Sequence, residues 1–550
     1  MFSADVRAVS RGSVVAMVVA AFLVRALALV AADDARLVLD ERDYLLRAEA
    51  LLDGQGFLGS LQTWVRHEGN PIDLPQYPGA WQPPGQTLFL ASALAVLGRN
   101  ATAARFAQVV MGTLGVWLVW LLGRAWLDDR HAIVSAWICA LYPNLVAFSH
   151  YLWSETLFIT LFLAALVLLT RRRAAPTATE AVVGGALLGL AALTRASALY
   201  FLPVLLLWMV WAWPSQRRRA LGRAALAASA ALLVILPWAV RNTMLHGGFV
   251  VIDTNAPYNL WRGNGPDAFA GRGTDAVDAY SWPFDGIPIA PVGNRNTRRL
   301  VDEARRDLGD PSPSDLEIAR YARASALESI REAPGRFFGR IPTRLEDLWN
   351  PTSFLLRHFQ LGAYGPVPGS VVTLVSSAAV VGYLALLVFA AAGWWRMRRR
   401  PEAWLILGWV LFLSAVSAVS FGLTRFRLPF VPLAAIAAAP ALLALLDRVR
   451  PRRAGALAAA ALVLPALLAC SPDRPAAEFV AGRNILWVVW DTVRSDHLGM
   501  YGYERPTTPK LDAWAAGTRV FDDVVSPAGY TLYHLKADPG LNSACIPLSS

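Results

Sequence analysis

The chain has 550 residues, of which 55% are hydrophobic and 17% are charged, and its mean hydropathy is +0.41. A soluble protein of this size usually carries about 25% charged residues, so the composition argues against an ordinary soluble enzyme. The net charge of +11 does not indicate nucleic-acid binding, because the arginines cluster beside apolar runs, where they orient a membrane protein.

Apolar runs recur along almost the whole chain. A run of about 20 residues matches the thickness of a bilayer core, and only helices or closed barrels satisfy their backbone there. The runs lack the alternation of barrel strands, so we predict an all-α polytopic membrane protein with about 11 transmembrane helices and external loops. The predicted spans are 12–31, 105–123, 132–149, 155–170, 181–194, 197–214, 224–240, 370–393, 403–422, 429–446 and 454–470.

The arginines predict the orientation of these spans. If the N-terminus, with Arg7 and Arg11, is cytoplasmic, every dense basic cluster falls on the inside, as the positive-inside rule expects. This requires that the short run 86–98 does not cross, and we predict an interfacial or re-entrant helix there. The inside clusters are Arg124 with Arg130, Arg171 to Arg173, Arg217 to Arg219, Arg396 with Arg398 to Arg400, and Arg448 to Arg453.

Two long segments, 32–104 and 241–369, then lie outside. The second has helical spacing over 299–349 and is predicted to form a small capping subdomain. The first opens with Asp40 and Glu41 directly after a predicted helix. Carboxylates at a membrane surface suit general-base or metal chemistry, although ordinary interfacial charge is an equally good interpretation of the residues alone.

A series of short motifs occurs in fixed order along the chain. They are Asp40-Glu41 with Tyr44, Leu51-Leu52 with Gly54 and Gly56-Phe57, Trp81 to Gly85, Tyr142-Pro143, Ser154 to Phe158, Gly189 to Arg195, Pro237 to Asn242, Thr254-Asn255, Asn259 to Asn264, and Arg425 to Pro429. In this order the motifs resemble the GT-C glycosyltransferases, in particular the bacterial protein-mannosyltransferase and aminoarabinose-transferase-like group. That resemblance implies transfer of a sugar from a polyprenyl-phosphate carrier at the outer face of the membrane.

The resemblance also assigns the acidic residues. Asp40 occupies the position of the family's base or metal-associated acid, and Glu41 is the adjacent acid that assists with metal or orientation. Glu155 corresponds to a second acid near the active site, unless it is a carboxylate favoured by the dipole at a helix N-terminus. A divalent metal ion stays open as a cofactor, although no dedicated ligand cluster is visible in the sequence.

Several arginines reach the outer side against the charge bias. Arg241, Arg425 and Arg427 fit a lipid phosphate, because the guanidinium fork matches phosphate oxygens; snorkelling or a carboxylate partner would explain them equally well. We expect Arg195 at the same site. Asn255, Asn259 and Asn264 suit sugar hydroxyls, but a turn-rich loop has the same composition.

The C-terminal part predicts a different module. Residues 451–475 contain an apolar run ending at Cys470, which resembles a lipoprotein signal or forms an eleventh helix. Residues 484–531 resemble the start of the sulfatase and alkaline-phosphatase superfamily, which implies that Asp491 is a metal ligand. We expect this α/β fragment to be incomplete and inactive, and 532–550 to be an unrelated, disordered tail.

The membrane glycosyltransferase, residues 1–450, is therefore the main predicted domain. Its predicted partners are a polyprenyl-phosphate sugar donor, the bilayer, and an envelope acceptor that is a protein, a lipid or a polysaccharide; nucleic acid is not expected. The predicted location is the bacterial inner membrane, with the active site on the periplasmic face. A transporter or flippase for a lipid-linked substrate, and a membrane-anchored sulfatase or phosphotransferase, remain the alternatives.

Overall fold

A computed structural model describes residues 9–32, 37, 40–59, 78–266, 293–360, 363–365, 367–448 and 507–515. The chain divides into two compact units. The first comprises residues 1–283 and 291–471 and contains the membrane helices. In the second, residues 284–290 and 472–550, the described part is the short helix α22, Pro509–Ala515. The predicted helix 454–470, the position of Asp491 and the tail 532–550 lie outside the described residues.

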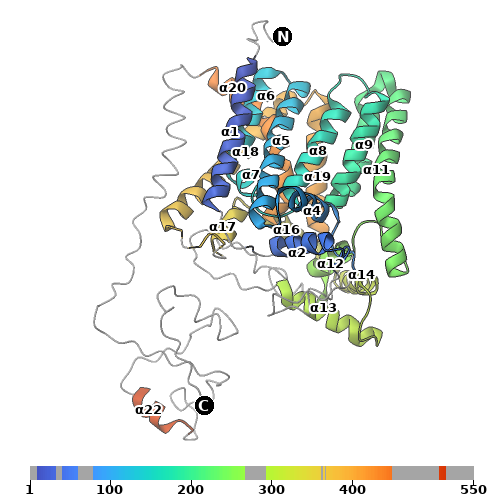
Figure 1. Ribbon diagram of the computed structural model, residues 1–550, viewed down its shortest axis with the longest axis vertical. Helices are drawn as coiled ribbons and strands as arrows, with labels where there is room; N and C mark the ends of the chain where they lie inside the picture. The colour runs from blue at the N-terminus through green and yellow to red at the C-terminus, as the bar shows by residue number, and fades with distance from the viewer. Residues whose placement is uncertain are drawn as a thin grey trace. The chain divides into compact units, whose positions relative to one another are not determined.

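Helices make up the described part of the first unit, where an isolated bridge between Leu58 and Pro78 is the one β feature (Figure 1). Six helical segments are long and apolar enough to cross a membrane, so the predicted all-α multi-pass fold is confirmed. The helices of these segments are α1 (Arg11–Ala31), α5 (Ala101–Trp126), α11 (Arg217–His246), α18 (Gly369–Met397), α19 (Pro401–Val419) and α20 (Val431–Leu446).

The remaining apolar helices of the bundle are shorter. They are α4 (Gly85–Leu97), α8 (Glu155–Thr170), α9 (Ala178–Thr194) and α10 (Ser197–Ala212). Helix α6 (Asp129–Leu141) packs against α1, α5 and α20. Each predicted span up to 429–446 falls on a helix, but 132–149 is not continuous. It breaks between α6 and α7 (Pro143–Ala147), since a proline cannot continue a helix without losing a backbone hydrogen bond.

The break at Pro143 explains an arginine inside the bundle. In an unbroken helix the carbonyl of Cys139 would accept from the N–H of residue 143, which proline lacks. Arg25 of α1 supplies the missing donors: its Nη2 lies 3.1 Å from the Cys139 oxygen and its Nη1 3.0 Å from the Ala140 oxygen. Its Nε donates to Ser149 Oγ over 3.0 Å. Its Nη1 also donates to the Ala21 carbonyl of α1 over 3.1 Å. Arg25 is 1% exposed, so protein groups rather than water solvate its charge.

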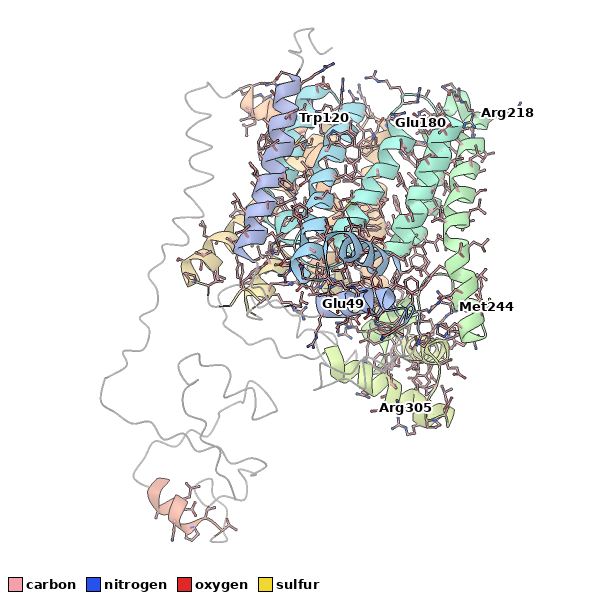
Figure 2. All side chains as sticks on the ribbon, in the orientation of Figure 1. Glu49, Trp120, Glu180, Arg218, Met244 and Arg305 are labelled. Carbon is pink, nitrogen blue, oxygen red and sulfur yellow. The ribbon has the colours of Figure 1, made fainter. Side chains whose placement is uncertain are left out.

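One end of the bundle carries the arginine-rich connections. Arg130, at the start of α6, pairs with Asp447 just beyond α20, and Arg171 and Arg172 pair with Glu180 of α9. Figure 2 shows Glu180 and Arg218 at this end and Glu49 of helix α2 at the other. The described arginines of the predicted inside clusters at Arg130, Arg171, Arg172 and Arg218 therefore lie at one end of the structure.

The opposite end is covered by shorter helices. Residues 32–104, which the sequence predicts to be external, contribute α2 (Asp40–Leu52), which packs on α4. The second such segment, residues 241–369, contributes α12 (Asn255–Asn264), α13 (Gly293–Leu308), α14 (Asp315–Glu332), α15 (Pro334–Gly339), α16 (Ile341–Trp349) and α17 (Phe354–Gln360). A separate apolar core joins α12, α13 and α14 around Trp81, Tyr258, Leu300 and Ile318, and its role as a capping subdomain stays a prediction.

Candidate active site

Four charged side chains meet at the end of the bundle covered by α2. Arg425 Nη1 lies 3.1 Å from Asp40 Oδ2, and Arg425 Nε lies 3.5 Å from Glu155 Oε1. Arg195 Nη1 lies 2.7 Å from the same Glu155 oxygen. The result is an alternating chain of charges, Asp40–Arg425–Glu155–Arg195, and the sequence predicted all four as site residues.

Each member comes from a different part of the fold. Asp40 begins α2, Glu155 begins α8, and Arg195 directly follows the last residue of α9. Arg425 lies in the 3-10 helix η4 (Thr424–Phe430), which leads directly into α20. Both acids stand at the first residue of a helix, where the helix dipole interacts favourably with a carboxylate. The acids and arginines are therefore held by helix ends rather than by free loops.

The four side chains differ in their access to solvent. Arg425, Asp40 and Arg195 keep 20 to 23% exposure, whereas Glu155 keeps 1%. A buried carboxylate is costly unless it is paired, and Glu155 Oε1 satisfies this with both guanidiniums while its Oε2 has no hydrogen-bond partner within the described structure. A ligand approaching from outside can therefore contact Asp40 and the two arginines, with Glu155 behind them.

Aromatic rings border the same arginine. The Arg425 guanidinium lies 4.6 Å from the centre of the Trp153 ring. Tyr44 of α2 is buried and hydrogen-bonded to Ser154, and burial, followed by the charge of Asp40, raises the pKa of Tyr44 far above its ordinary value. The phenol therefore stays protonated and neutral beside the acids.

Glu41 faces away from this chain of charges. It is 2% exposed, and its Oε1 accepts a hydrogen bond from the backbone N–H of Leu152 over 3.1 Å. Although Asp40 and Glu41 are neighbours in sequence, their side chains lie on different sides of α2. The predicted catalytic pair is divided between the ion-paired site and the protein interior.

Two predicted phosphate-binding arginines hold main-chain segments. Arg241 donates to the carbonyls of Gly79 and Phe57 over 2.8 and 3.2 Å and lies over the Trp238 ring. Arg427, 4% exposed, donates to the carbonyls of Leu348, Asn350 and Thr352 beyond the end of α16. Each arginine thus joins the main chain of a segment that the sequence predicts to be external to a helix or helix end of the bundle.

The three predicted sugar-binding asparagines lie along α12. Asn264 is buried and donates to the carbonyls of Leu260 and Val419, while its Oδ1 accepts from Arg344. Asn255 begins the helix and its N–H donates to Asp253. Asn259 is half-buried in the middle of the helix. The side chain of Asn264 is therefore used in internal hydrogen bonds, and Asn255 and Asn259 are the two more accessible asparagines of α12.

Sequence reasoning missed Asp253, which precedes α12. Burial raises the pKa of Asp253 to about 6, against the N–H donors of Asn255 and Ala256 and the charge of Arg195, which lower it. Asp253 therefore lies within electrostatic range of Arg195, just before α12. Its signal in the sequence was the Asp-Thr-Asn run before a helix, which is also an ordinary helix start.

The described residues of the site offer no obvious set of metal ligands. Within the described ranges, no three His, Cys, Asp or Glu side chains cluster closely enough to hold one. Asp40 and Glu155 instead lie against arginines. The predicted metal ligand Asp491 falls outside the described residues.

Comparison with known families matches both predicted modules. The family model described as dolichyl-phosphate-mannose-protein mannosyltransferase matches residues 81–240, and the sulfatase family model matches residues 483–533. These matches confirm the two resemblances predicted from the motifs.

Curated relatives extend the first match over most of the chain. The undecaprenyl phosphate-alpha-4-amino-4-deoxy-L-arabinose arabinosyl transferase of Pseudomonas aeruginosa strain LESB58 is 28% identical over 429 residues, 75% of this chain and 71% of the relative. The enzyme of the same name from Pseudomonas paraeruginosa is 31% identical over 206 residues, 36% of this chain and 35% of the relative. The chain is therefore homologous to membrane glycosyltransferases.

Two solved structures show a weaker similarity. The oligosaccharyltransferase of Archaeoglobus fulgidus matches 84% of this chain at 16% identity and a TM-score of 0.46, and the chain spans 55% of that protein. ArnT from Cupriavidus metallidurans bound to undecaprenyl phosphate matches 79% of this chain and 77% of its own length, at 16% identity and a TM-score of 0.36.

Proposed function

We propose that this chain, a homologue of undecaprenyl-phosphate-dependent arabinosyl transferases, moves a sugar from a polyprenyl-phosphate donor to an acceptor of the cell envelope. The observation that supports this most directly is the ion pair between Asp40 and Arg425 beside Glu155 and Arg195. It combines a candidate base with two candidate phosphate ligands at one end of a membrane bundle.

In the proposed reaction the acceptor hydroxyl attacks the anomeric carbon of the donor sugar. A bond forms from the acceptor oxygen to that carbon, and the bond between the carbon and the phosphate oxygen breaks. Asp40 takes the hydroxyl proton, and polyprenyl phosphate leaves with the bonding electron pair. Arg425 and Arg195 stabilise the negative charge that grows on the phosphate.

The present pairing suggests how donor binding prepares the base. Two carboxylates and two guanidiniums balance one another, so a donor phosphate brings an additional negative charge. When Arg425 turns toward the phosphate, Asp40 loses its partner and its oxygens become free to accept a proton. Glu155 stays paired with Arg195, which keeps the buried acid neutralised.

We propose that the site lies on the periplasmic side of the inner membrane. The support is the separation between the four charged residues at one end of the bundle and the arginine-rich connections at the other, because such connections prefer the cytoplasm.

Dependence of the reaction on a divalent metal ion is a separate part of the proposal. Since the described carboxylates form no three-ligand group, no step is assigned to a metal, and assays with and without a chelator would test for one.

The experiment that tests the function is sugar transfer by the purified full chain from a labelled polyprenyl-phosphate sugar in detergent or vesicles. We expect Asp40→Asn to bind donor with similar affinity and to lose turnover by a factor of about 100 or more, as for removal of a general base. Movement of the intact donor across the bilayer without transfer would instead identify a transporter. Full turnover by Asp40→Asn would reject the assigned base.

A further inference from the structure

The backbone between α7 and α8 follows no regular structure, yet it carries the site. This segment, residues 148–154, leads directly into Glu155 and contains Trp153, which lies under Arg425. An irregular backbone buried inside a protein needs hydrogen-bond partners from elsewhere. Those partners come from side chains of three different helices, and their arrangement shows what sets the position of Glu155.

Two buried glutamines bind the carbonyls of the segment. Gln108 of α5 donates through Nε2 to the carbonyls of Tyr151 and, over 3.2 Å, Trp153. Gln86 of α4 donates to the intervening carbonyl of Leu152 over 3.2 Å. Three consecutive carbonyls are thus bound from two helices, which fixes the direction of the backbone just before Ser154.

Glu41 provides the complementary contact. Its Oε1 accepts the N–H of Leu152 over 3.1 Å, so this residue is bound on both its backbone N–H and its carbonyl. Glu41 and Asp40 are neighbours at the start of α2. The position of the proposed base is therefore coupled through α2 to the segment that carries Glu155.

The glutamines are buried at an energetic cost. Gln86 and Gln108 are each 0% exposed, and their Oε1 atoms have no hydrogen-bond partner among the described residues. Burying an unsatisfied amide oxygen is unfavourable, so packing alone would favour an apolar side chain at both positions. An apolar side chain could not replace the N–H donors of these two amides.

From these contacts we infer that Glu41, Gln86 and Gln108 are positioning residues that hold residues 151–153 and thereby set Glu155 and Trp153 against Arg425. The inference rests on the proposed function for its catalytic consequence. It assigns Glu41 a hydrogen-bonding role through the backbone, in place of a role as an acid or metal ligand that contacts substrate.

A pair of substitutions at Glu41 separates these roles. Glu41→Gln keeps an oxygen that can accept the Leu152 N–H but removes the carboxylate, whereas Glu41→Ala removes both. We expect Glu41→Gln to keep most of the turnover and Glu41→Ala to lose it by roughly a hundredfold, because small misplacements of reacting groups have effects of this size. Gln86→Met and Gln108→Met should resemble Glu41→Ala.

Hydrogen exchange measures the positioning without using activity. In peptides covering residues 148–156, we expect faster exchange of the Leu152 amide in Glu41→Ala than in wild type, and near wild-type exchange in Glu41→Gln. The matched control is Ser92→Ala on α4, since the Ser92 hydroxyl is exposed and binds only within its own helix to the Leu88 carbonyl. This control should change neither exchange nor turnover.

The outcomes distinguish the two proposals. If Glu41→Gln is as inactive as Glu41→Ala while its Leu152 amide stays protected, Glu41 acts chemically and the inference is wrong. Unchanged exchange in a folded Glu41→Ala protein would also overturn it. If wild type transfers no sugar at all, the proposed function falls, whereas the exchange data still decide whether these three residues position the segment.

Discussion

Arg425 and Asp40 lie 385 positions apart in sequence and 3.1 Å apart in space. Arg425 is thus ion-paired with the carboxylate that the proposed reaction needs as a base. Arg425 also pairs with Glu155. Among the four charged site residues, all of them described, it is the only arginine that pairs with both acids, which begin two different helices. Its loss should therefore affect both donor binding and the state of Asp40.

The first prediction concerns Arg425→Gln. Removing the guanidinium takes away a donor-phosphate ligand and leaves Glu155 with Arg195 alone, so we expect KM for the donor to rise about tenfold or more and kcat to fall. Arg425→Lys should recover charge without the two-pronged geometry and give an intermediate result. Arg218→Gln, at the arginine-rich end of the bundle, is the control (Figure 2). Equal kinetics for Arg425→Gln and the control would exclude this role.

The second prediction concerns the stability contributed by Arg25. Arg25→Met leaves the carbonyls of Cys139 and Ala140 without their donors, and we expect a loss of roughly 2 kcal/mol of unfolding free energy. The exposed Arg11→Met on the same helix should change stability little. In a Pro143→Ala background residue 143 regains an N–H, so Arg25→Met should cost less there. Strictly additive effects in this double-mutant cycle would contradict the explanation.

The membrane helices were predictable from the sequence because apolar runs and flanking arginines report burial in lipid directly. The break at Pro143 was less visible, because a proline in an apolar run is compatible with either a kink or a stop. Arg25 lies inside an apolar run, where a charge is costly, but its partners Ser149 and Ala140 are more than 100 positions away in the sequence. No local pattern in the sequence could identify them.

The four charged site residues were predicted individually, by motif resemblance, but their connectivity was not. Which acid faces which arginine depends on how α2, α8, α9 and η4 meet, and this is a tertiary property. The same limit applies to Glu41, whose neighbour Asp40 suggested a shared role. Only the direction of each side chain on α2 separates them.

The third prediction concerns orientation in the membrane. In a parent with Cys470 and Cys545 replaced by Ser, an impermeant thiol reagent should label Asp53→Cys in intact cells, because Asp53 lies at the end of the structure that carries the site and its side chain is 49% exposed. Arg218→Cys should be labelled only after the membrane is permeabilised. The natural Cys139 is buried and should stay unlabelled. The reverse pattern would place the site in the cytoplasm.

The fourth prediction concerns pH. Burial lowers the pKa of His150 to about 3, and Arg105 reinforces this effect. Burial likewise lowers the pKa of His358 to about 3, with further lowering by Arg357, His150 and Arg425 against the Phe354 carbonyl. Since both folded-state values lie below the ordinary 6.5, each neutral imidazole contributes stability that is complete above pH 6.5 and is lost as the pH falls toward 3.

The measurement is the thermal unfolding temperature between pH 7 and pH 5. Wild type should lose stability over this range, and the non-titrating His150→Gln/His358→Gln double variant should lose less of its own starting value. His358 stacks on Tyr151 at 3.7 Å, so both proteins must first be shown to fold at pH 7. Parallel curves for the two proteins would show that these imidazoles do not set the acid sensitivity.

The last prediction concerns the sulfatase-like segment, residues 483–533. The four charged site residues all lie in the first unit of the chain, so deletion of residues 472–550 should leave kcat and KM for sugar transfer unchanged. The full chain should also be assayed for hydrolysis of sulfate and phosphate monoesters, with Asp491→Asn as the matched variant. Hydrolysis that depends on Asp491 would assign the second unit an activity of its own, and loss of transfer on deletion would show that the membrane unit needs it.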